Sequence, residues 1–231
     1  MFRHYVYTVV IASFFMPASP RPRQSARRPH GRRATPSGGS GPDLREAILA
    51  ATVRLLADQS FTDLAVADIL TAAGVSRGTF YFYFDSKQAV LAELVRRAVA
   101  QGHAAAAPWL AGPPDQVAAL RAGTAAGAKL WQASAPVLRA IVENWRTDPR
   151  LTALWLEQMQ TFTDATIAQI SADPHAQEIL TGQDIAAVAS ALTWLGERLY
   201  YLAATSTPPF DNQETLIDTL VSIWAAVLYR E

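Results

Sequence analysis

The chain has 231 residues, 50% of them apolar, which is enough to bury a substantial core in one large domain or two small ones. It contains no cysteine, so disulfides, thiolate metal sites and a cysteine nucleophile are excluded, and a reducing cytoplasm is the expected compartment. The formal net charge is zero, but the charges are unevenly distributed along the chain. Residues 1–42 carry seven arginines and no acidic residue, and the remaining residues carry 13 basic and 20 acidic side chains. This asymmetry is typical of a basic arm attached to a folded acidic body.

The N-terminal 42 residues divide into an apolar and a basic segment. Residues 1–16 are mostly apolar and too short to span a bilayer. They are compatible with a signal-peptide core, with a mis-assigned start codon or unstructured extension, or with a membrane-docking segment of a tethered regulator. Residues 17–42 are rich in Pro, Arg, Gly and Ser and cannot bury enough apolar surface to offset chain entropy. We expect residues 1–42 to form a disordered basic extension that adds nonspecific affinity for phosphate.

Helical periodicity begins at Asp43. This residue can accept hydrogen bonds from the first free amides of a helix, and Glu46 can reach back to it, which is close to a capping box. Apolar residues then recur on one helix face at Leu44, Ala47, Ile48, Ala51, Leu55 and Leu56. The pattern predicts a first helix from Asp43 to a break at residues 58–60.

Two short helices joined by a tight turn follow. Gly74 permits a left-handed turn, and Ser76 can cap a helix over residues 77–83. The short helix before the turn is outlined by Val66, Ile69, Leu70 and Ala73. The arrangement predicts a helix-turn-helix.

The rest of the chain is also helical in its periodicity. A fourth helix is expected after a cap at Asp85 or Ser86. The later segments are interrupted at Pro108, Pro113-Pro114, Asp148-Pro149, Asp173-Pro174 and Pro208-Pro209. Since no run of strands and no internal repeat is evident, the sequence predicts an all-α fold.

The segment from Phe61 to Leu91, FTDLAVADILTAAGVSRGTFYFYFDSKQAVL, resembles the DNA-binding signature of the TetR/AcrR family of transcriptional regulators. The matching features are the small-small-glycine turn, the Ser-x-Gly-Thr start of the third helix, its Tyr-x-Tyr-Phe end and the Ser-Lys start of the fourth helix. The resemblance covers residues 43–103 and implies a three-helix helix-turn-helix DNA-binding domain there, connected through helix four. It also implies a C-terminal helical ligand-binding and dimerisation domain over residues 104–231.

The start of the third helix carries the candidate DNA contacts. The N-terminal residues of a recognition helix enter the major groove, so Arg77 can bind a guanine or contact only a phosphate, and Gly78 lets the backbone approach the DNA. The resemblance implies phosphate contacts by Tyr81, Tyr83 and Lys87, with packing of the tyrosines and simple solvation of the lysine as alternatives. The predicted DNA-binding residues are Ser76, Arg77, Gly78, Thr79, Tyr81, Tyr83 and Lys87.

One position departs from the family pattern. Ala65 stands where the family usually has Ser or Thr, so the second helix must take its cap from Thr62 or Asp63, or lack one. Phe80, Phe82 and Phe84 are expected mostly to pack, Phe80 and Phe84 in the core. Residues 43–103 hold six basic and seven acidic residues, so the DNA-binding prediction rests on the motif and not on charge.

Residues 155–166, 196–198 and 223–224 resemble the subgroup of the ethionamide-resistance repressor, in which a narrow tunnel binds an amphiphilic small molecule. Thr166, Thr193 and Glu197 would be its polar anchors. The subgroup has Asn at positions 193 and 196 and an aromatic residue at Gly127, which implies a differently shaped and less polar-selective pocket here. The alternative is an ordinary aromatic core. By position, the tunnel would be lined by Trp131, Trp155, Met159, Phe162, Thr166, Thr193, Glu197 and Trp224.

The last two predicted helices, at about residues 183–204 and 213–229, have more apolar positions than one face can bury. With the family pattern, this implies a two-fold homodimer. The apolar positions are Ile185, Val188, Leu192, Leu195, Leu199 and Leu202 in one helix, and Leu216, Ile217, Leu220, Val221, Ile223, Trp224, Val227 and Leu228 in the other.

The expected function is a ligand-responsive regulator, a repressor that binds an inverted-repeat operator in double-stranded DNA as a dimer and is released by a small hydrophobic or amphiphilic effector. The alternative is a small helical enzyme or lipid-binding protein that uses the tunnel. Four scattered histidines and the absence of a phosphate loop or nucleophile elbow oppose an enzyme, and a lone Glu197 is more often a satisfied buried acid than a catalyst. We expect no catalytic residue, no cofactor and no metal site.

Overall fold

A computed structural model describes residues 41–110 and 115–229 of the chain. The expectations for residues 1–40, including the signal, tethering and basic-arm interpretations, lie outside the described residues. Within the described ranges all regular elements are helices, which confirms the all-α prediction. None of these helices combines the length and apolar character of a membrane span.

The first described helix, α2 (Gly41–Asp58), begins two residues earlier than predicted. Gly41 and Pro42, assigned above to the extension, form its first turn, where a proline is tolerated because its missing N–H has no helical partner. The predicted capping role of Glu46 is also wrong. Its carboxylate accepts two hydrogen bonds of 2.8 Å from the guanidinium of Arg97. This charged pair ties α2 to helix α5 (Lys87–Leu110).

The helices α3 (Val66–Ala73) and α4 (Arg77–Tyr83) lie at the predicted positions. Gly74 has φ of 64°, and the Val75 amide donates to the Leu70 carbonyl at 3.1 Å, which closes the turn between the helices. Ser76 Oγ accepts from the Thr79 amide at 3.1 Å, as the predicted cap requires. The core beneath these helices includes the buried side chains of Ile48, Leu64, Ile69, Phe80 and Phe84.

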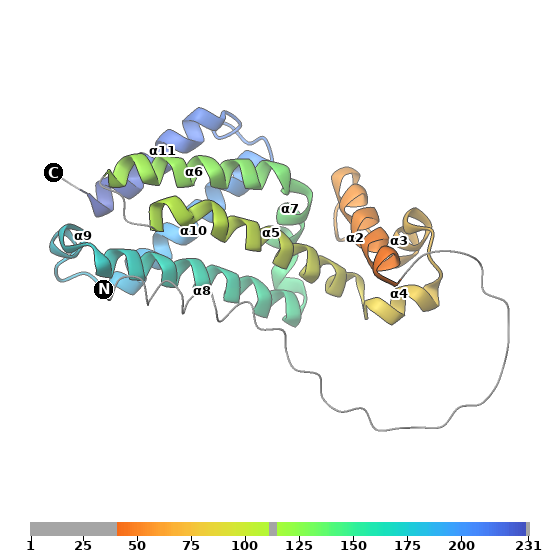
Figure 1. The fold of residues 1–231 in the computed structure, drawn as a ribbon. Helices are drawn as coiled ribbons and strands as arrows, with labels where there is room; N and C mark the ends of the chain where they lie inside the picture. The colour runs from red at the N-terminus through yellow and green to blue at the C-terminus, as the bar shows by residue number, and fades with distance from the viewer. Residues whose placement is uncertain (1–40, 111–114, 230–231) are drawn as a thin grey trace, which may run out of the picture. The chain divides into compact units, whose positions relative to one another are not determined.

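Helix α5 connects the helix-turn-helix to the rest of the chain (Figure 1). Ser86 Oγ accepts from the Ala89 amide at 3.2 Å, which identifies Ser86 as its cap. The interruption expected at Pro108 is wrong, because α5 continues to Leu110. Proline removes one helical hydrogen bond and crowds the preceding turn, but two residues from the helix end that cost falls on the last turn alone.

The remaining helices begin and end mostly where the sequence places a break. Asp148 and Asp173 each accept from two backbone amides at the start of a helix, and a proline follows each of them. Pro208 and Pro209 fall between the last two helices. The elements are α6 (Gln116–Ala133), α7 (Ala135–Asn144), η1 (Trp145–Thr147), α8 (Pro149–Ala172), α9 (Pro174–Ile179), α10 (Ile185–Ala204) and α11 (Gln213–Leu228).

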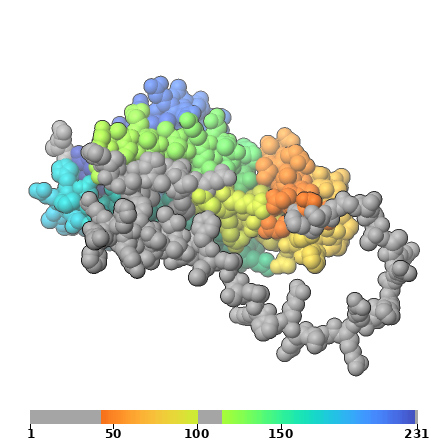
Figure 2. Space-filling model, viewed as in Figure 1, coloured from red at the N-terminus to blue at the C-terminus, as the bar shows by residue number. Residues whose placement is uncertain are grey.

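The helix-turn-helix packs directly against this C-terminal helical part. One hydrophobic cluster runs from Ile48 and Phe80 through α5 to Ile141 on α7 and Met159 on α8. A second cluster joins α6, α10 and α11. Thr62, in the loop before α3, also donates to Asn144 Oδ1 on α7 at 3.0 Å. Helices α2 to α4 and the C-terminal helices therefore form adjoining parts of one unit (Figure 2).

Candidate functional site

The N-terminus of α4 faces outward. Ser76, Arg77, Gly78 and Tyr81 are exposed, while Thr79, like Tyr83 and Lys87, is half-buried. A Cβ at Gly78 would meet only Ser76 Oγ, at 3.8 Å, so packing within the chain does not require glycine there. The Arg77 guanidinium lies over the Tyr81 ring, 5.9 Å from its centroid. These side chains share an accessible end of the helix, the part that enters a groove in helix-turn-helix proteins.

The three phenylalanines of this segment do not all pack. Phe80 and Phe84 are buried, as predicted, but Phe82 is 79% exposed, which corrects the expectation of packing for that residue. The helical rotation of about 100° per residue explains the difference, because Phe82 points to the side opposite Phe80, whereas Phe84 follows Phe80 by one turn.

The Lys87 ammonium binds backbone carbonyls and is not simply solvated. Its Nζ donates to the carbonyls of Phe61, Thr62 and Leu64 at 2.8, 3.0 and 2.7 Å, which occupies all three ammonium hydrogens. Burial lowers the pKa of Lys87, against a smaller opposing effect of Asp63. Lys87 therefore positions the loop that leads into α3, and a phosphate contact would require it to release a carbonyl.

Without a hydroxyl at position 65, α3 has no side-chain cap at its N-terminus, which is one of the outcomes expected from the sequence. Neither Thr62 nor Asp63 caps α3. Instead the Asp68 carboxylate, in the first turn, accepts from the Ala65 amide at 2.9 Å. Only half of a capping box is present, because the alanine side chain cannot accept in return.

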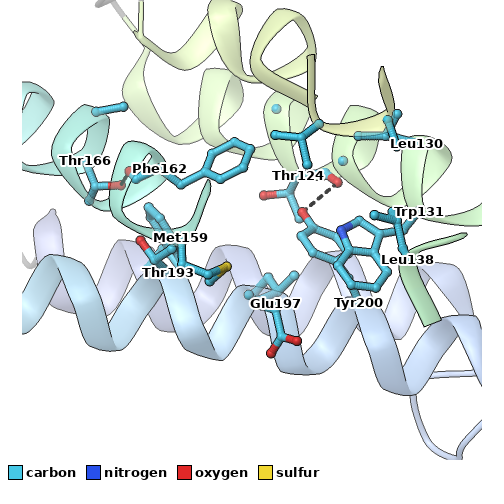
Figure 3. Close-up of a pocket in the computed structure, with 18 of the residues that line it drawn as sticks. Thr124, Leu130, Trp131, Leu138, Met159, Phe162, Thr166, Thr193, Glu197 and Tyr200 are labelled. Atoms are coloured by element: carbon cyan, nitrogen blue, oxygen red, sulfur yellow. Dashed lines mark hydrogen bonds between the residues drawn. The ribbon is translucent and has the colours of Figure 1, made fainter. Parts of the chain in front are cut away.

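A cavity of about 190 Å³ lies among α5, α6, α8, α10 and α11 (Figure 3). All eight residues that the resemblance placed in the tunnel line it, which brings together side chains from residue 131 to residue 224. Sequence reasoning missed α5, which contributes Ala98 and Val99, the residues of α6 other than Trp131, such as Thr124 and Leu130, and Tyr200 on α10. The wall of the cavity is mostly apolar, as a site for a hydrophobic molecule requires.

The polar groups of this cavity are incompletely paired. Thr166 Oγ1 donates to the Phe162 carbonyl at 3.0 Å. The buried Trp155 Nε1 and Thr193 Oγ1 find no hydrogen-bond partner among the described residues. Glu197 is 6% exposed, and burial raises the pKa of its carboxyl, partly offset by Arg198. Of the three predicted anchors, Thr166 is paired within its own helix, Thr193 Oγ1 has no partner among the described residues, and the Glu197 carboxylate lies 4.0 Å from Arg198 Nε.

Tyr200 and Gly127 form a matched pair in the wall. A Cβ at Gly127 would lie 2.7 Å from the Tyr200 hydroxyl oxygen, so the ring occupies space that only glycine leaves open. The ring stacks on Trp131 at 6.0 Å between centroids, and its hydroxyl donates to the Thr124 carbonyl at 3.1 Å. Burial raises the pKa of this phenol. The feature of the sequence that could have pointed to Tyr200 is Gly127, where the resembled subgroup carries an aromatic residue.

The apolar positions predicted on the last two helices are only partly buried by the chain itself. The chain itself buries seven of those positions, namely Leu192, Leu199, Leu216, Ile217, Leu220, Val221 and Leu228. Ile223 remains exposed, while the other predicted positions of α10 and α11 are half-buried. The interior of the chain therefore buries half of the fourteen predicted positions, and the other half stay at least partly accessible.

A capped helix with an exposed N-terminus in a helix-turn-helix, followed by a helical region with an apolar cavity, is the architecture of a helix-turn-helix regulator with a second helical region. Two family models match the chain: "Bacterial regulatory proteins, tetR family" over residues 48–94, and "Transcriptional regulator EthR, C-terminal domain" over residues 120–230. The chain belongs to the TetR family of transcriptional regulators.

Curated relatives extend the match to nearly the whole chain. The HTH-type transcriptional regulator EthR of Mycobacterium tuberculosis is 34% identical over 212 residues, 89% of this chain and 95% of the relative. EthR of Mycolicibacterium smegmatis is 31% identical over 207 residues, 88% and 93% of the two chains. The fatty acid degradation regulator FadR from Bacillus halodurans shares the fold, with a TM-score of 0.66 at 16% identity over 85% of this chain and all of that one. These relatives are transcriptional regulators and not enzymes, which removes the enzyme alternative.

Proposed function

We propose that this protein is a ligand-responsive repressor, which binds an inverted-repeat operator as a dimer and is released by a small hydrophobic or amphiphilic effector. The observation that carries the proposal is that α5 belongs to both candidate sites. Its first residue, Lys87, holds the loop before α3, and Ala98 and Val99 line the cavity. At 1.5 Å per helical residue, these points lie about 17 Å apart along one rigid element.

On the DNA side, we assign base contacts to the start of α4 and phosphate contacts to its flank. Arg77 would bind a guanine edge, and Gly78 would allow close approach of the backbone. Tyr81 and Tyr83 would contact phosphates, together with Lys87 if it releases a carbonyl. A two-fold dimer would place two such helices about 34 Å apart, one turn of DNA, in the cytoplasm where the operator lies.

On the effector side, we assign the cavity as the binding site. An occupant that moves α5 at Ala98 and Val99 would also move Arg97, which binds Glu46 of α2. The helix-turn-helix would then shift relative to that of the partner, and its spacing would no longer fit successive major grooves. Because coupling between two binding sites is reciprocal, operator DNA must weaken effector binding by the same factor.

The dimer contact would use α10 and α11, as in the family pattern. Its candidate surface is the set of residues that the single chain leaves accessible on these helices, including Ile223 and the small side chains Ala186, Ala187 and Ala191. Small side chains let two helices approach closely. Sedimentation of the full-length protein should give a dimer, and a monomer at micromolar concentration would contradict this part of the proposal.

The test of DNA binding is a gel shift with the full-length protein and fragments from around its own gene, at low salt and with competitor DNA. A footprint over an inverted repeat is expected, and effectors found by tryptophan fluorescence should weaken the complex. The absence of any DNA binding at low salt would overturn the proposal.

A further inference from the structure

The side of α4 that faces directly away from the core is formed by Gly78 and Phe82. At about 100° per helical residue, each of them is turned about 160° from the buried Phe80, in opposite senses, so the two lie only about 40° apart. A Cβ at Gly78 would meet only Ser76 Oγ, at 3.8 Å. Among the seven residues of α4, Phe82 is therefore the one whose side chain projects from the middle of this outer side.

The Phe82 ring is held in water by the packing of its neighbours. It is 79% exposed, more than any other large apolar side chain that the structure describes. It meets the half-buried Tyr83 ring edge to face, at 4.9 Å between centroids. Because Phe80 and Phe84 are buried, α4 cannot turn the Phe82 ring inward without exposing them. An exposed phenyl ring gains free energy when a bound partner removes it from water.

The position of this ring indicates DNA as the partner, and the chemistry of the major groove narrows the contact to one group. The second helix of a helix-turn-helix, here α4, lies in the major groove. The base edges there present hydrogen-bond donors and acceptors, and their apolar group is the C5-methyl of thymine. A phenyl ring has no donor or acceptor to pair with the polar edges, and covering them without pairing costs free energy. Against the methyl group, it removes apolar surface from water.

We propose that Phe82 is a specificity-determining residue, whose ring contacts the C5-methyl group of a thymine in each half-site of the operator. Gly78, one turn earlier on the same side of α4, has no side chain and allows the helix to lie close to the bases. The ring would add an apolar contact near the end of α4 to the hydrogen bonds assigned to Arg77 at its start. This inference rests on the proposed function, in which α4 is the helix that enters the groove.

The first experiment removes the methyl group from the DNA. In the operator footprinted with the full-length protein, symmetric pairs of thymines are replaced one pair at a time by deoxyuridine, which keeps the base pair and lacks only the methyl group. Fluorescence anisotropy measures the affinity. For at least one pair it should fall about fourfold per half-site, and thus about tenfold or more. If no pair changes the affinity by more than about twofold, the proposal is overturned without any variant protein.

The second experiment removes the ring. Phe82→Ala should weaken binding of the thymine operator about tenfold and reduce the effect of the sensitive deoxyuridine pair to less than about twofold, because the methyl group has lost its partner. Phe82→Leu keeps an apolar side chain and should restore part of the discrimination. Tyr81→Phe is the matched control, since it removes only a hydroxyl from the neighbouring exposed ring and should leave the deoxyuridine effect unchanged.

The same measurements separate a methyl contact from other uses of the ring. If Phe82→Ala weakens binding but discriminates against deoxyuridine as strongly as the unaltered protein, the ring contacts sugar or phosphate and the proposal is overturned.

Failure of this inference and failure of the proposed function give different results. The absence of any DNA binding overturns both. A footprint over an inverted repeat, with an affinity that neither deoxyuridine nor Phe82→Ala lowers, supports the proposed function and overturns the role of Phe82.

Discussion

The helix-turn-helix and the cavity differ in how their polar groups are paired. In α2, α3 and α4, as far as the structure describes them, every buried side-chain polar atom has a partner, and the nearby Lys87 ammonium makes three hydrogen bonds to carbonyls. The cavity instead leaves Trp155 Nε1 and Thr193 Oγ1 unpaired and holds the Glu197 carboxyl without a cation inside it. The chain itself therefore pairs the buried polar side chains of the first region, whereas it leaves two of those in the cavity wall without a partner.

The largest effect expected on stability comes from the buried face of the recognition helix. Phe80→Ala removes a fully buried ring of α4 from the hydrophobic cluster that includes residues of α2 and α5, and should lower the free energy of unfolding by about 3–5 kcal/mol. Urea denaturation followed by circular dichroism measures it.

The matched control is the exposed ring on the same seven-residue helix. Phe82→Ala should change the free energy of unfolding by less than about 0.5 kcal/mol, because Phe82 is exposed. Similar losses for both variants would contradict the orientation of α4 and with it the outward position of the candidate DNA contacts.

Removal of the Lys87 ammonium should have the next largest effect. Lys87→Met leaves the carbonyls of Phe61, Thr62 and Leu64 without their common donor and should cost about 2–3 kcal/mol in the same denaturation experiment. Lys129→Met on the exposed side of α6 is the control and should be nearly neutral. If the Lys87 variant is fully stable but binds DNA poorly, a phosphate contact describes the residue better than its role in holding the loop.

These two regions were also unequally predictable from the sequence. The bounds of α3 and α4, the left-handed Gly74 and the Ser76 cap follow from interactions among residues close in the chain, and such signals are legible in a sequence. The three carbonyls bound by Lys87 lie 23 to 26 residues away, so no local pattern announces them. The exposure of Phe82 could have been predicted from helical geometry, but the run of aromatic residues favoured packing.

The cavity illustrates the same limit more strongly. Eight of its lining residues were found only through a resemblance, since they come from helices far apart in the chain. Tyr200 was missed because its position in the cavity depends on the space left by Gly127, 73 positions earlier, and a glycine in a helix has many possible reasons. The unpaired state of Trp155 Nε1 and Thr193 Oγ1 depends on every neighbouring side chain and is visible only in the folded structure.

A smaller effect on stability is expected at Gly127, where it tests the fit of Tyr200. Gly127→Ala places a methyl group 2.7 Å from the Tyr200 hydroxyl oxygen, so the ring must move and weaken its stacking on Trp131. The free energy of unfolding should fall by about 1–2 kcal/mol, and the tryptophan emission should shift.

Gly196→Ala is the matched control for this variant. It adds the same methyl group at an ordinary distance of 4.0 Å from the same ring and should be neutral or slightly stabilising. Equal effects of the two substitutions would show that helix propensity, and not the Gly127–Tyr200 contact, sets the response.

The smallest effect on stability is expected at Gly78, where the demands of the fold and of DNA binding separate. A methyl group there meets only Ser76 Oγ, at 3.8 Å, so Gly78→Ala should raise the free energy of unfolding by up to about 1 kcal/mol through helix propensity. At the exposed N-terminus of α4 the same methyl group would stand between the backbone and the DNA, and operator affinity should fall about tenfold or more. Fluorescence anisotropy with a labelled operator measures that loss beside the urea curve. A variant that gains stability and keeps full affinity would mean that DNA does not approach the backbone at Gly78, and the contact surface would then have to be sought at Arg77 and Tyr81, along the outer flank of the helix.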